Sequence, residues 1–580
     1  MVEKIQITID EHNKYCAQMD DLCDKSDFNG IVSLCQSLEK STHSSAIIRM
    51  HIYYNIASGY SHVGARRDNT FDSVTSGLAS LNFRKALAEA KAVERDQFND
   101  IYTESELFAF ADLKSRLQTN FANELDHQGR RLESLAIYNE PIRAGNVYAV
   151  LGKARCLYHL AESVYDDGHA FHLYRESAKH YQEALSRVEE FDPVHREAIR
   201  NDEFHNQFLS WFSIKEEQIG AEIPELENLP GSDFKTRKEK DYFAWCAEQR
   251  LFINELNSIS IASVVDHDVL NLPGFTTRMN PLLTHSEELS FHGHFNEMKT
   301  DYCYARYLAY MGCSIPLFEE HFFNSTFEQV DTLDYQVDNL KAHHLKSCFR
   351  ISYSIFDKVA FFLHRFFQLD ATKNDHQIDF KKIWFKPGNQ SLKAMFQNSD
   401  NSHFRALYFL SREIRQAGRD VPEDRDPSYW FDPDTERLFK IRNFIEHRSF
   451  KLVDGVCYRI TESFPSSLGS VDEYKMELSE KTNELARMIK IKGSQHSDPD
   501  LDTRIRKLEE RIEQLNNDLD EKARMSSYSL TVGIEEFERL TIKLLTLAKD
   551  ALIYLSLGIH HEERKKASIG LTIPRYVPKK

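Results

Sequence analysis

The residues with the clearest chemical potential lie close together, at Arg442, Asn443 and His447 in the segment DTERLFKIRNFIEHRSFKL. They place a permanent cation, an amide and a titratable imidazole within two turns of an expected helix. Arg442 could hold a phosphate and stabilise the charge that develops on it. His447 could exchange protons near neutral pH, because an imidazole has an unperturbed pKa of about 6.5. These groups suit cleavage of an RNA phosphodiester without a metal.

The spacing of this motif does not identify it by itself. An Arg followed five residues later by a His also occurs at Arg175 and His180 and at Arg200 and His205. With 25 His in 580 residues, such a pair should arise by chance roughly once or twice. The surrounding sequence must therefore decide which pair, if any, has a chemical role.

Helix geometry shows what the motif can and cannot do alone. Asn443 and His447 are neighbours one turn apart, and so are Arg442 and Glu446. For in-line attack on phosphorus, the ribose 2′-hydroxyl must lose a proton and the leaving 5′-oxygen must gain one. The negative charge on the equatorial phosphate oxygens must also be stabilised. One Arg and one His are too few for both proton transfers, whereas two facing copies of the chain would supply two of each. Asn443 could orient His447 or contact a sugar. Glu446 could hold Arg442 flat for a bidentate phosphate contact or form an ordinary intrahelical salt bridge.

The composition indicates a soluble protein with several domains. A chain of 580 residues is too long for a single core and predicts two to four domains. No apolar run approaches the roughly 20 residues that cross a bilayer, and the start MVEKIQITIDEHNK lacks the apolar region of a signal peptide. The net charge of −17 argues against a protein that coats nucleic acids, but it leaves room for a small, local RNA site.

The cysteines and histidines do not predict a cofactor. The nine cysteines are scattered, odd in number and without a C-x-x-C pair, which favours a reducing cytosol over disulfides or structural zinc. His292 and His294 form an H-x-H pair without a third ligand, so we expect structural polarity there. No glycine-rich phosphate loop is present. We therefore expect a cytoplasmic protein with no metal and no cofactor.

The apolar spacing predicts a nearly all-α chain. Residues 1–204 contain helix hairpins that resemble tetratricopeptide repeats and stack into a solenoid, with a generic helical array as the alternative. The segment QTNFANELDHQGRRLESLAIYNEPI carries the repeat positions Ala122, Leu125, Gly129, Ser134, Tyr138 and Pro141. Residues 205–331 read as a connecting region with turn signals such as LNLPGF. Helices richer in aromatic residues return over residues 332–575, and the closing segment TIKLLTLAKDALIYLSLGIHHEE predicts a long amphipathic helix.

A heptad pattern interrupts this last region. Its positions are Leu501, Ile505, Leu508, Ile512, Leu515 and Leu519. A weaker seam precedes it at Tyr474, Leu478, Leu485 and Met488, with Lys481 as the exception, and GSQHSDPD at 493–500 separates the two. The pattern predicts an antiparallel coiled-coil hairpin inserted over residues 471–522. It could serve as an arm for a partner or for dimerisation, or as a solvated spacer.

The C-terminal portion resembles the HEPN superfamily (higher eukaryote and prokaryote nucleotide-binding domains), specifically a bacterial branch with a helical-repeat half in front. The resemblance is carried by YSIFDKVAFFLHRFF at 353–367, by SLKAMF and RALYFLSREI within 391–414, by RLFKIRNFIEHR at 437–448 and by the closing helix. The family motif is Arg, a polar residue, a few further residues and His, and Arg442, Asn443 and His447 fill these places. The pair at Arg200 lies outside any such bundle.

The resemblance implies a bundle of four to six helices that dimerises through the motif-bearing helices. It further implies a metal-independent endoribonuclease that leaves 2′,3′-cyclic phosphate ends and acts as a toxin or anti-phage effector. RNA would be the substrate, a second copy of the chain the dimer partner, and a regulatory protein a possible ligand of the repeats. The alternative is a non-catalytic scaffold, in which the repeats bind a protein and the bundle only dimerises. Nucleotide binding is a third and weaker interpretation.

Overall fold

The structure is a computed structural model of the chain. It describes residues 5–66, 72–96, 102–220, 222–229, 231, 233–273, 281–319, 321–326, 336–369, 378–386, 391–397, 399–414, 433–455, 477–478, 481–482, 484–485, 488, 499–526 and 528–566. Helices make up nearly all of its regular structure, which confirms the predicted all-α class. Among these residues, no helix is long and apolar enough to cross a membrane.

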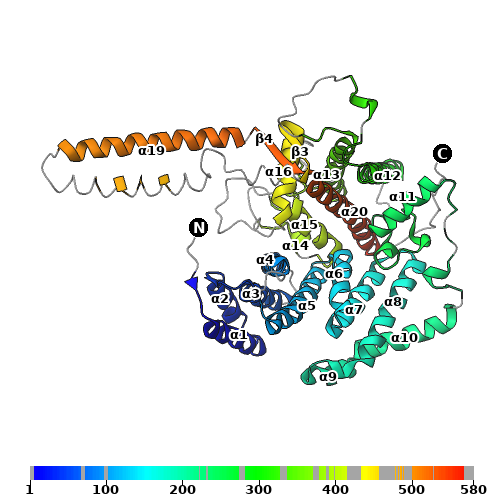
Figure 1. Cartoon of the computed structure of the whole chain (residues 1–580). Coiled ribbons are helices and arrows are strands. Elements are labelled where there is room, and N and C mark those ends of the chain that lie inside the picture. Colours follow the sequence, from blue (N-terminus) through cyan, green and yellow to red (C-terminus); the bar gives the residue numbers. More distant parts are fainter. Residues whose placement is uncertain are drawn as a thin grey trace. The chain divides into compact units, whose positions relative to one another are not determined.

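The first half of the chain is a succession of helices (Figure 1). They are α1 (Ile9–Asp24), α2 (Phe28–Leu38), α3 (Ala46–Arg66), α4 (Ser73–Asp96), α5 (Glu104–His127), α6 (Arg131–Arg143), α7 (Val147–Ser163), α8 (Asp167–Ser186), α9 (Pro193–Arg200), α10 (Glu203–Ile219), α11 (Arg237–Glu248) and α12 (Pro281–Ser314). Short parallel strands β1 (Ile5–Gln6) and β2 (Ser41–Thr42) flank α1 and α2. The second half contains α13 (Leu340–Phe366), α14 (Ala394–Gln397), α15 (Ser402–Ile414), α16 (Pro433–His447), β3 (Ser449–Val453), α19 (Pro499–Ser526), β4 (Ser529–Gly533) and α20 (Ile534–Arg564).

The chain divides into two compact units. Unit 1 comprises residues 1–307, 351–436 and 544–580, and unit 2 comprises residues 308–350 and 437–543. Segments from the whole length of the sequence therefore meet within unit 1. The boundaries predicted from the sequence, at 1–204, 205–331 and 332–575, remain predictions.

Paired helices build the N-terminal part of unit 1. Helix α3 packs against α4, α5 against α6, and α7 against α8. A serine makes the same contact in two successive pairs: Ser134 Oγ donates to the carbonyl of Ala122, and Ser177 Oγ donates to that of Ala154, each over 2.7 Å. These small, buried residues let the helices approach closely. The contacts agree with a repeated hairpin, and the tetratricopeptide likeness remains a prediction.

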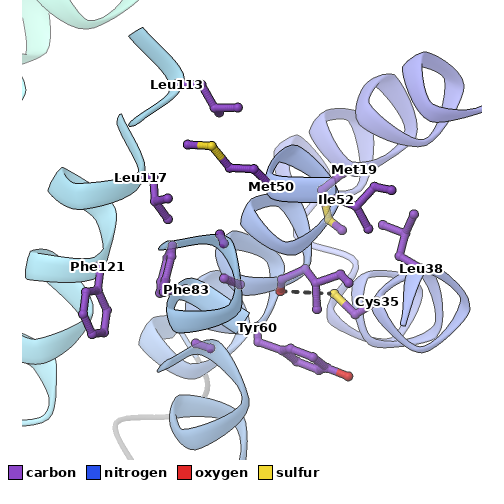
Figure 2. Close-up of a cluster of buried hydrophobic side chains, with 14 of the residues drawn as sticks. Met19, Cys35, Leu38, Met50, Ile52, Tyr60, Phe83, Leu113, Leu117 and Phe121 are labelled. Atoms are coloured by element: carbon purple, nitrogen blue, oxygen red, sulfur yellow. Dashed lines mark hydrogen bonds between the residues drawn. The ribbon is translucent and has the colours of Figure 1, made fainter. Parts of the chain in front are cut away.

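A continuous hydrophobic core joins α1 to α5 (Figure 2). Phe83 and Leu117 are fully buried in it, and Met19 extends into it from α1. The thiol of Cys35 donates to the main-chain oxygen of Ile56 over 3.6 Å, as the dashed line in Figure 2 shows. The core thus fixes the first helices by apolar contact, with a satisfied thiol inside it.

Helix α20 was predicted to be amphipathic, and this is wrong for its central part. Every residue from 547 to 559 is buried. Its polar side chains are satisfied by segments distant in sequence: Lys549 Nζ donates to the carbonyl of Arg250 over 2.9 Å, and Ser556 Oγ donates to that of Asn271 over 2.7 Å. Tyr554 Oη accepts from the amide of Leu132 over 3.2 Å. In unit 1, α20 is therefore a central helix, and polar residues on it do not mark a solvent face.

Unit 2 contains a parallel strand pair that was not predicted from the sequence. Strands β3 and β4 pair from Ser449 with Ser529 to Val453 with Gly533, and Gln336 adds an antiparallel bridge to Val453. Strand β3 follows α16 directly, so it fixes the direction in which the chain leaves the motif helix. The two strands also bracket the predicted insertion.

The predicted heptad segment is a single long helix, α19, within unit 2. Ile505, Leu508 and Leu515 on its seam are buried. Arg511 of α19 pairs with Glu477, at 2.9 Å between Nη2 and Oε1, which brings the segment before the insertion beside it. Tyr474, residues 493–498 and the side chain of Leu501 lie outside the described residues. The hairpin remains a prediction that this pairing supports.

Candidate active site

Helix α16 positions all three predicted site residues in unit 2. Its apolar positions hold it in place, because Leu438 and Ile441 are 1% exposed and Phe444 and Ile445 are 9% and 8% exposed. Arg442 and Asn443 are half-buried, whereas Glu446, His447 and Arg448 are exposed. The motif therefore lies where α16 passes from the packed interior to solvent, so that a ligand can reach its polar groups.

The structure brings two of the three predicted residues into direct contact. Arg442 Nη1 donates a hydrogen bond to Asn443 Oδ1 over 3.2 Å. This bond restrains both side chains at the edge of the buried face. In the part of the chain that the structure describes, the His447 imidazole makes no hydrogen bond, and it is exposed one turn beyond Asn443. Asn443 therefore restrains the cation, and its predicted roles, orienting His447 or contacting a sugar, remain predictions.

Glu446 has a partner outside its own helix. Arg350 on α13 lies 3.3 Å from it, measured from Nε to Oε1. The same guanidinium donates from Nη2 to the main-chain oxygen of Ile445 over 2.8 Å. From the sequence, only Arg442 was expected as the partner of Glu446, because Arg350 is distant in sequence and carries no motif. Arg350 thus joins the site as a residue that sequence reasoning missed.

The surroundings of the motif are basic although the whole chain is acidic. Residues 437–451 contain five basic residues and one acidic residue, and residues 340–350 contain three basic residues and no acidic one. The guanidinium of Arg448 lies over the ring of Phe444, 5.1 Å from its centroid, and Lys346 lies over the ring of Phe450 at 5.7 Å. Burial lowers the pKa of the Lys346 ammonium. This local excess of cations is suited to a phosphate ligand.

The other two Arg and His pairs have structural surroundings in unit 1. Arg175 is buried and donates to Glu216 and to the carbonyl of Ile223, at 2.7 and 2.9 Å from Nη2. His205 is buried against Tyr181, with the two ring centroids 4.5 Å apart. Both side chains are used in packing, which leaves the pair on α16 as the better candidate.

The model of the LA2681-like HEPN family matches residues 282–490. The match includes α13, α15 and α16 and with them all three predicted site residues. Over this span, the chain is similar to the HEPN superfamily. The HEPN match begins within the segment that was predicted to be a connecting region, and it covers less than half of the chain. HEPN domains are generally ribonuclease-type enzymes, act on RNA and often dimerise. No curated protein and no solved structure matches the chain.

Proposed function

We propose that the chain is a metal-independent endoribonuclease whose catalytic residues are Arg442, Asn443 and His447. The observation that carries the proposal is their arrangement on α16. Arg442 is restrained by Asn443, and His447 stands exposed one turn away within the HEPN domain. An anchored guanidinium beside an accessible imidazole provides the two functions that RNA cleavage needs, namely charge stabilisation and proton transfer.

The proposed reaction uses two copies of the chain. His447 accepts the proton of a ribose 2′-hydroxyl, and the 2′-oxygen attacks the adjacent phosphorus. The bond from phosphorus to the 5′-oxygen breaks, and the partner's His447 donates a proton to the leaving 5′-oxygen. The products are a 2′,3′-cyclic phosphate and a free 5′-hydroxyl. Arg442 contacts the phosphate and offsets the charge on its equatorial oxygens.

The acidic remainder of the chain has a role in this proposal. A net charge of −17 opposes general binding of nucleic acids, so RNA would be held only at the basic segments around α16. The helical-repeat half then regulates the nuclease through a protein ligand. Such an enzyme fits a toxin or an anti-phage effector in the cytoplasm, where uncontrolled cleavage would be harmful.

The test compares wild type with the double variant Arg442→Ala/His447→Ala on purified RNA in the presence of EDTA. Wild type should cut the RNA and leave 2′,3′-cyclic phosphate ends, and the double variant should cut at least about 100-fold more slowly, since general acid–base catalysis contributes 10² or more. His195→Ala/Arg200→Ala is the matched control, because it removes the same residue types from exposed positions of α9.

Equal cleavage by wild type and the double variant would exclude the proposed site. A wild type that cuts no RNA, together with growth effects that survive the double substitution, would favour the non-catalytic scaffold instead. Circular dichroism of all three proteins checks that the helices remain folded.

A further inference from the structure

A cluster of metal-ligating side chains lies between α1 and α3 in unit 1. His12 and Cys16 are one turn apart on α1, and His51 and Asn55 are one turn apart on α3. The ligand atoms of His12, Cys16 and His51 all lie within 4.8 Å of one another. His12 Nε2 is 3.7 Å from Cys16 Sγ, and the ring centroids of His12 and His51 are 4.8 Å apart. Two facing helices thus present three donors to one point.

The separation of two of these donors is close to that in a tetrahedral zinc site. With Zn–S near 2.3 Å and Zn–N near 2.1 Å, a tetrahedral angle places sulfur and nitrogen about 3.6 Å apart. The separation of Cys16 Sγ from His12 Nε2 is close to this value. Zinc binds thiolate and imidazole ligands, whereas magnesium and calcium prefer oxygen ligands. Small rotations of the half-buried His51 side chain would complete the geometry.

The buried side chain of His12 lies beside other polar groups. Helix α1 buries only two side chains fully, Met19 and His12. Met19 belongs to the hydrophobic core in Figure 2, whereas His12 is 2% exposed and faces a thiol and a second imidazole. Burial lowers the pKa of His12 and lowers that of His51 to about 4, so both rings are neutral near pH 7. Neutral rings have the lone pair that a metal requires.

One neighbour of Cys16 favours its thiolate form. Asn55 Nδ2 donates to Cys16 Sγ over 3.1 Å, and such a donor orients a sulfur ligand and stabilises its negative charge. Burial raises the pKa of the Cys16 thiol, and the charge of Asp20, one turn later on α1, raises it further, whereas the bond from Asn55 lowers it. An anionic group near the sulfur would be costly for a lone thiolate but is favourable beside a divalent cation.

We propose that His12, Cys16 and His51 bind a zinc ion that fastens α1 to α3, with water or Asp20 in the fourth position. On binding, Cys16 releases its thiol proton to solvent, and both imidazoles remain neutral. The ion would strengthen the attachment of the first helix, which otherwise depends on few buried side chains. No metal was expected from the sequence, because the ligands form no known motif and His51 lies on a different helix.

The binding experiment uses the full chain, freed of metal and titrated with Zn²⁺ and with Co²⁺. Wild type should bind one Zn²⁺, and its Co²⁺ form should show thiolate-to-cobalt charge-transfer absorption. Cys16→Ser and His51→Gln should lose the tight site, and Asn55→Ala should weaken it roughly tenfold, as expected for an outer-shell partner. Cys23→Ser is the matched control, because it makes the same change on α1 outside the cluster.

Thermal unfolding supplies a second measurement that does not depend on RNA cleavage. Zinc should raise the melting temperature of wild type and Cys23→Ser, and it should leave those of Cys16→Ser and His51→Gln unchanged. The proposal is overturned if zinc binds both cluster variants as tightly as wild type. It is also overturned if wild type binds no zinc or if its cobalt complex lacks the thiolate band.

Discussion

Arg350 donates a hydrogen bond from Nη2 to the main-chain oxygen of Ile445 over 2.8 Å. Carbonyls in the last turn of a helix lack intrahelical partners, and a cation there interacts favourably with the helix dipole. The turn that Arg350 secures carries His447. The same guanidinium pairs with Glu446. We therefore regard Arg350 as a positioning residue, which acts through the end of α16 and not on the substrate.

The first prediction concerns this residue. Arg350→Lys keeps the charge but cannot make both contacts at once, because an ammonium lacks the planar fork of a guanidinium. We expect the single-turnover rate of RNA cleavage to fall about tenfold, since small displacements of catalytic groups are costly. The free energy of unfolding should change by less than about 1 kcal/mol, because the ion pair is half-exposed.

Arg437→Lys is the control for that prediction. It makes the same exchange near the other end of α16, where Arg437 pairs with Glu536. Its cleavage rate should equal that of wild type. The dependence of the cleavage rate on pH is measured for both variants. If Arg350→Lys cleaves RNA at the wild-type rate, or if its pH dependence differs from wild type no more than that of Arg437→Lys, Arg350 has no positioning role.

The contacts around α16 illustrate what the sequence can reveal about this site. The motif was expected on a helix, and α16 (Pro433–His447) is that helix. The motif was found because its residues are close in sequence. Arg350 was not found, because its contact with Glu446 depends on how α13 and α16 pack, and spacing within one helix carries no information about that.

The misjudged elements share a similar cause. Periodicity treats a polar residue as exposed, yet Lys549 and Ser556 of α20 are buried and bonded to carbonyls from the region around 250–271. Strand β3 has only five residues, and its partner β4 lies beyond the insertion. A pairing between such distant short segments leaves no local pattern in the sequence. Both errors arise from contacts that only the folded chain brings together.

A second prediction follows from the proposed use of two histidines, one from each copy of the chain. Wild type mixed with an equal amount of the Arg442→Ala/His447→Ala variant, after the dimers have exchanged, should retain intact pairs in about one quarter of the dimers. The cleavage rate should therefore fall by about half, because wild-type dimers are one half of all dimers before exchange and one quarter after it. The measurement is RNA cleavage before and after exchange at constant wild-type concentration. A rate that does not change would mean that each copy carries a complete site.

The third prediction concerns a buried ion cluster in unit 1. Glu413 of α15 accepts from Arg130 at 2.5 and 2.8 Å and also from Arg84, and Arg130 is in turn paired with Glu133. Arg130 and Glu413 are 1% and 4% exposed. Glu413 lies in the HEPN match, so the cluster joins the N-terminal helices to that domain within unit 1. Glu413→Gln leaves two guanidinium groups buried beside a neutral amide.

We expect Glu413→Gln to lower the free energy of unfolding by about 3–5 kcal/mol, the usual cost of breaking a buried ion pair from one side. Urea unfolding followed by circular dichroism measures it. Glu176→Gln, which removes a partly exposed pair with Lys179, should cost less than about 1 kcal/mol. Similar losses for the two variants would show that the cluster does not fasten the N-terminal helices to α15.

The fourth prediction is a loss of stability in mild acid that depends on His403. This side chain on α15 is fully buried, and its ring stacks on that of Tyr554 with the centroids 6.3 Å apart. Burial lowers its pKa well below the ordinary value, and the charges of Arg131, His561, Arg405 and His560 lower it further. The folded chain therefore keeps His403 neutral at a pH where the unfolded chain binds a proton.

The sign follows from this difference in proton binding. Because the folded-state pKa is depressed, the contribution is complete above the unfolded value near 6.5 and is lost as the pH falls below it. Between pH 6.5 and pH 5, this one group should remove about 1.5 kcal/mol of stability. His403→Gln should be less stable than wild type at neutral pH, because it loses packing. Between pH 6.5 and pH 5, however, its free energy of unfolding should fall by about 1.5 kcal/mol less than that of wild type. Denaturant unfolding at pH 6.5 and at pH 5 measures the change in the free energy of unfolding of each protein. His195→Gln is an exposed control, and its change should equal that of wild type. Parallel slopes for wild type and His403→Gln would show that His403 takes up its proton in the folded chain.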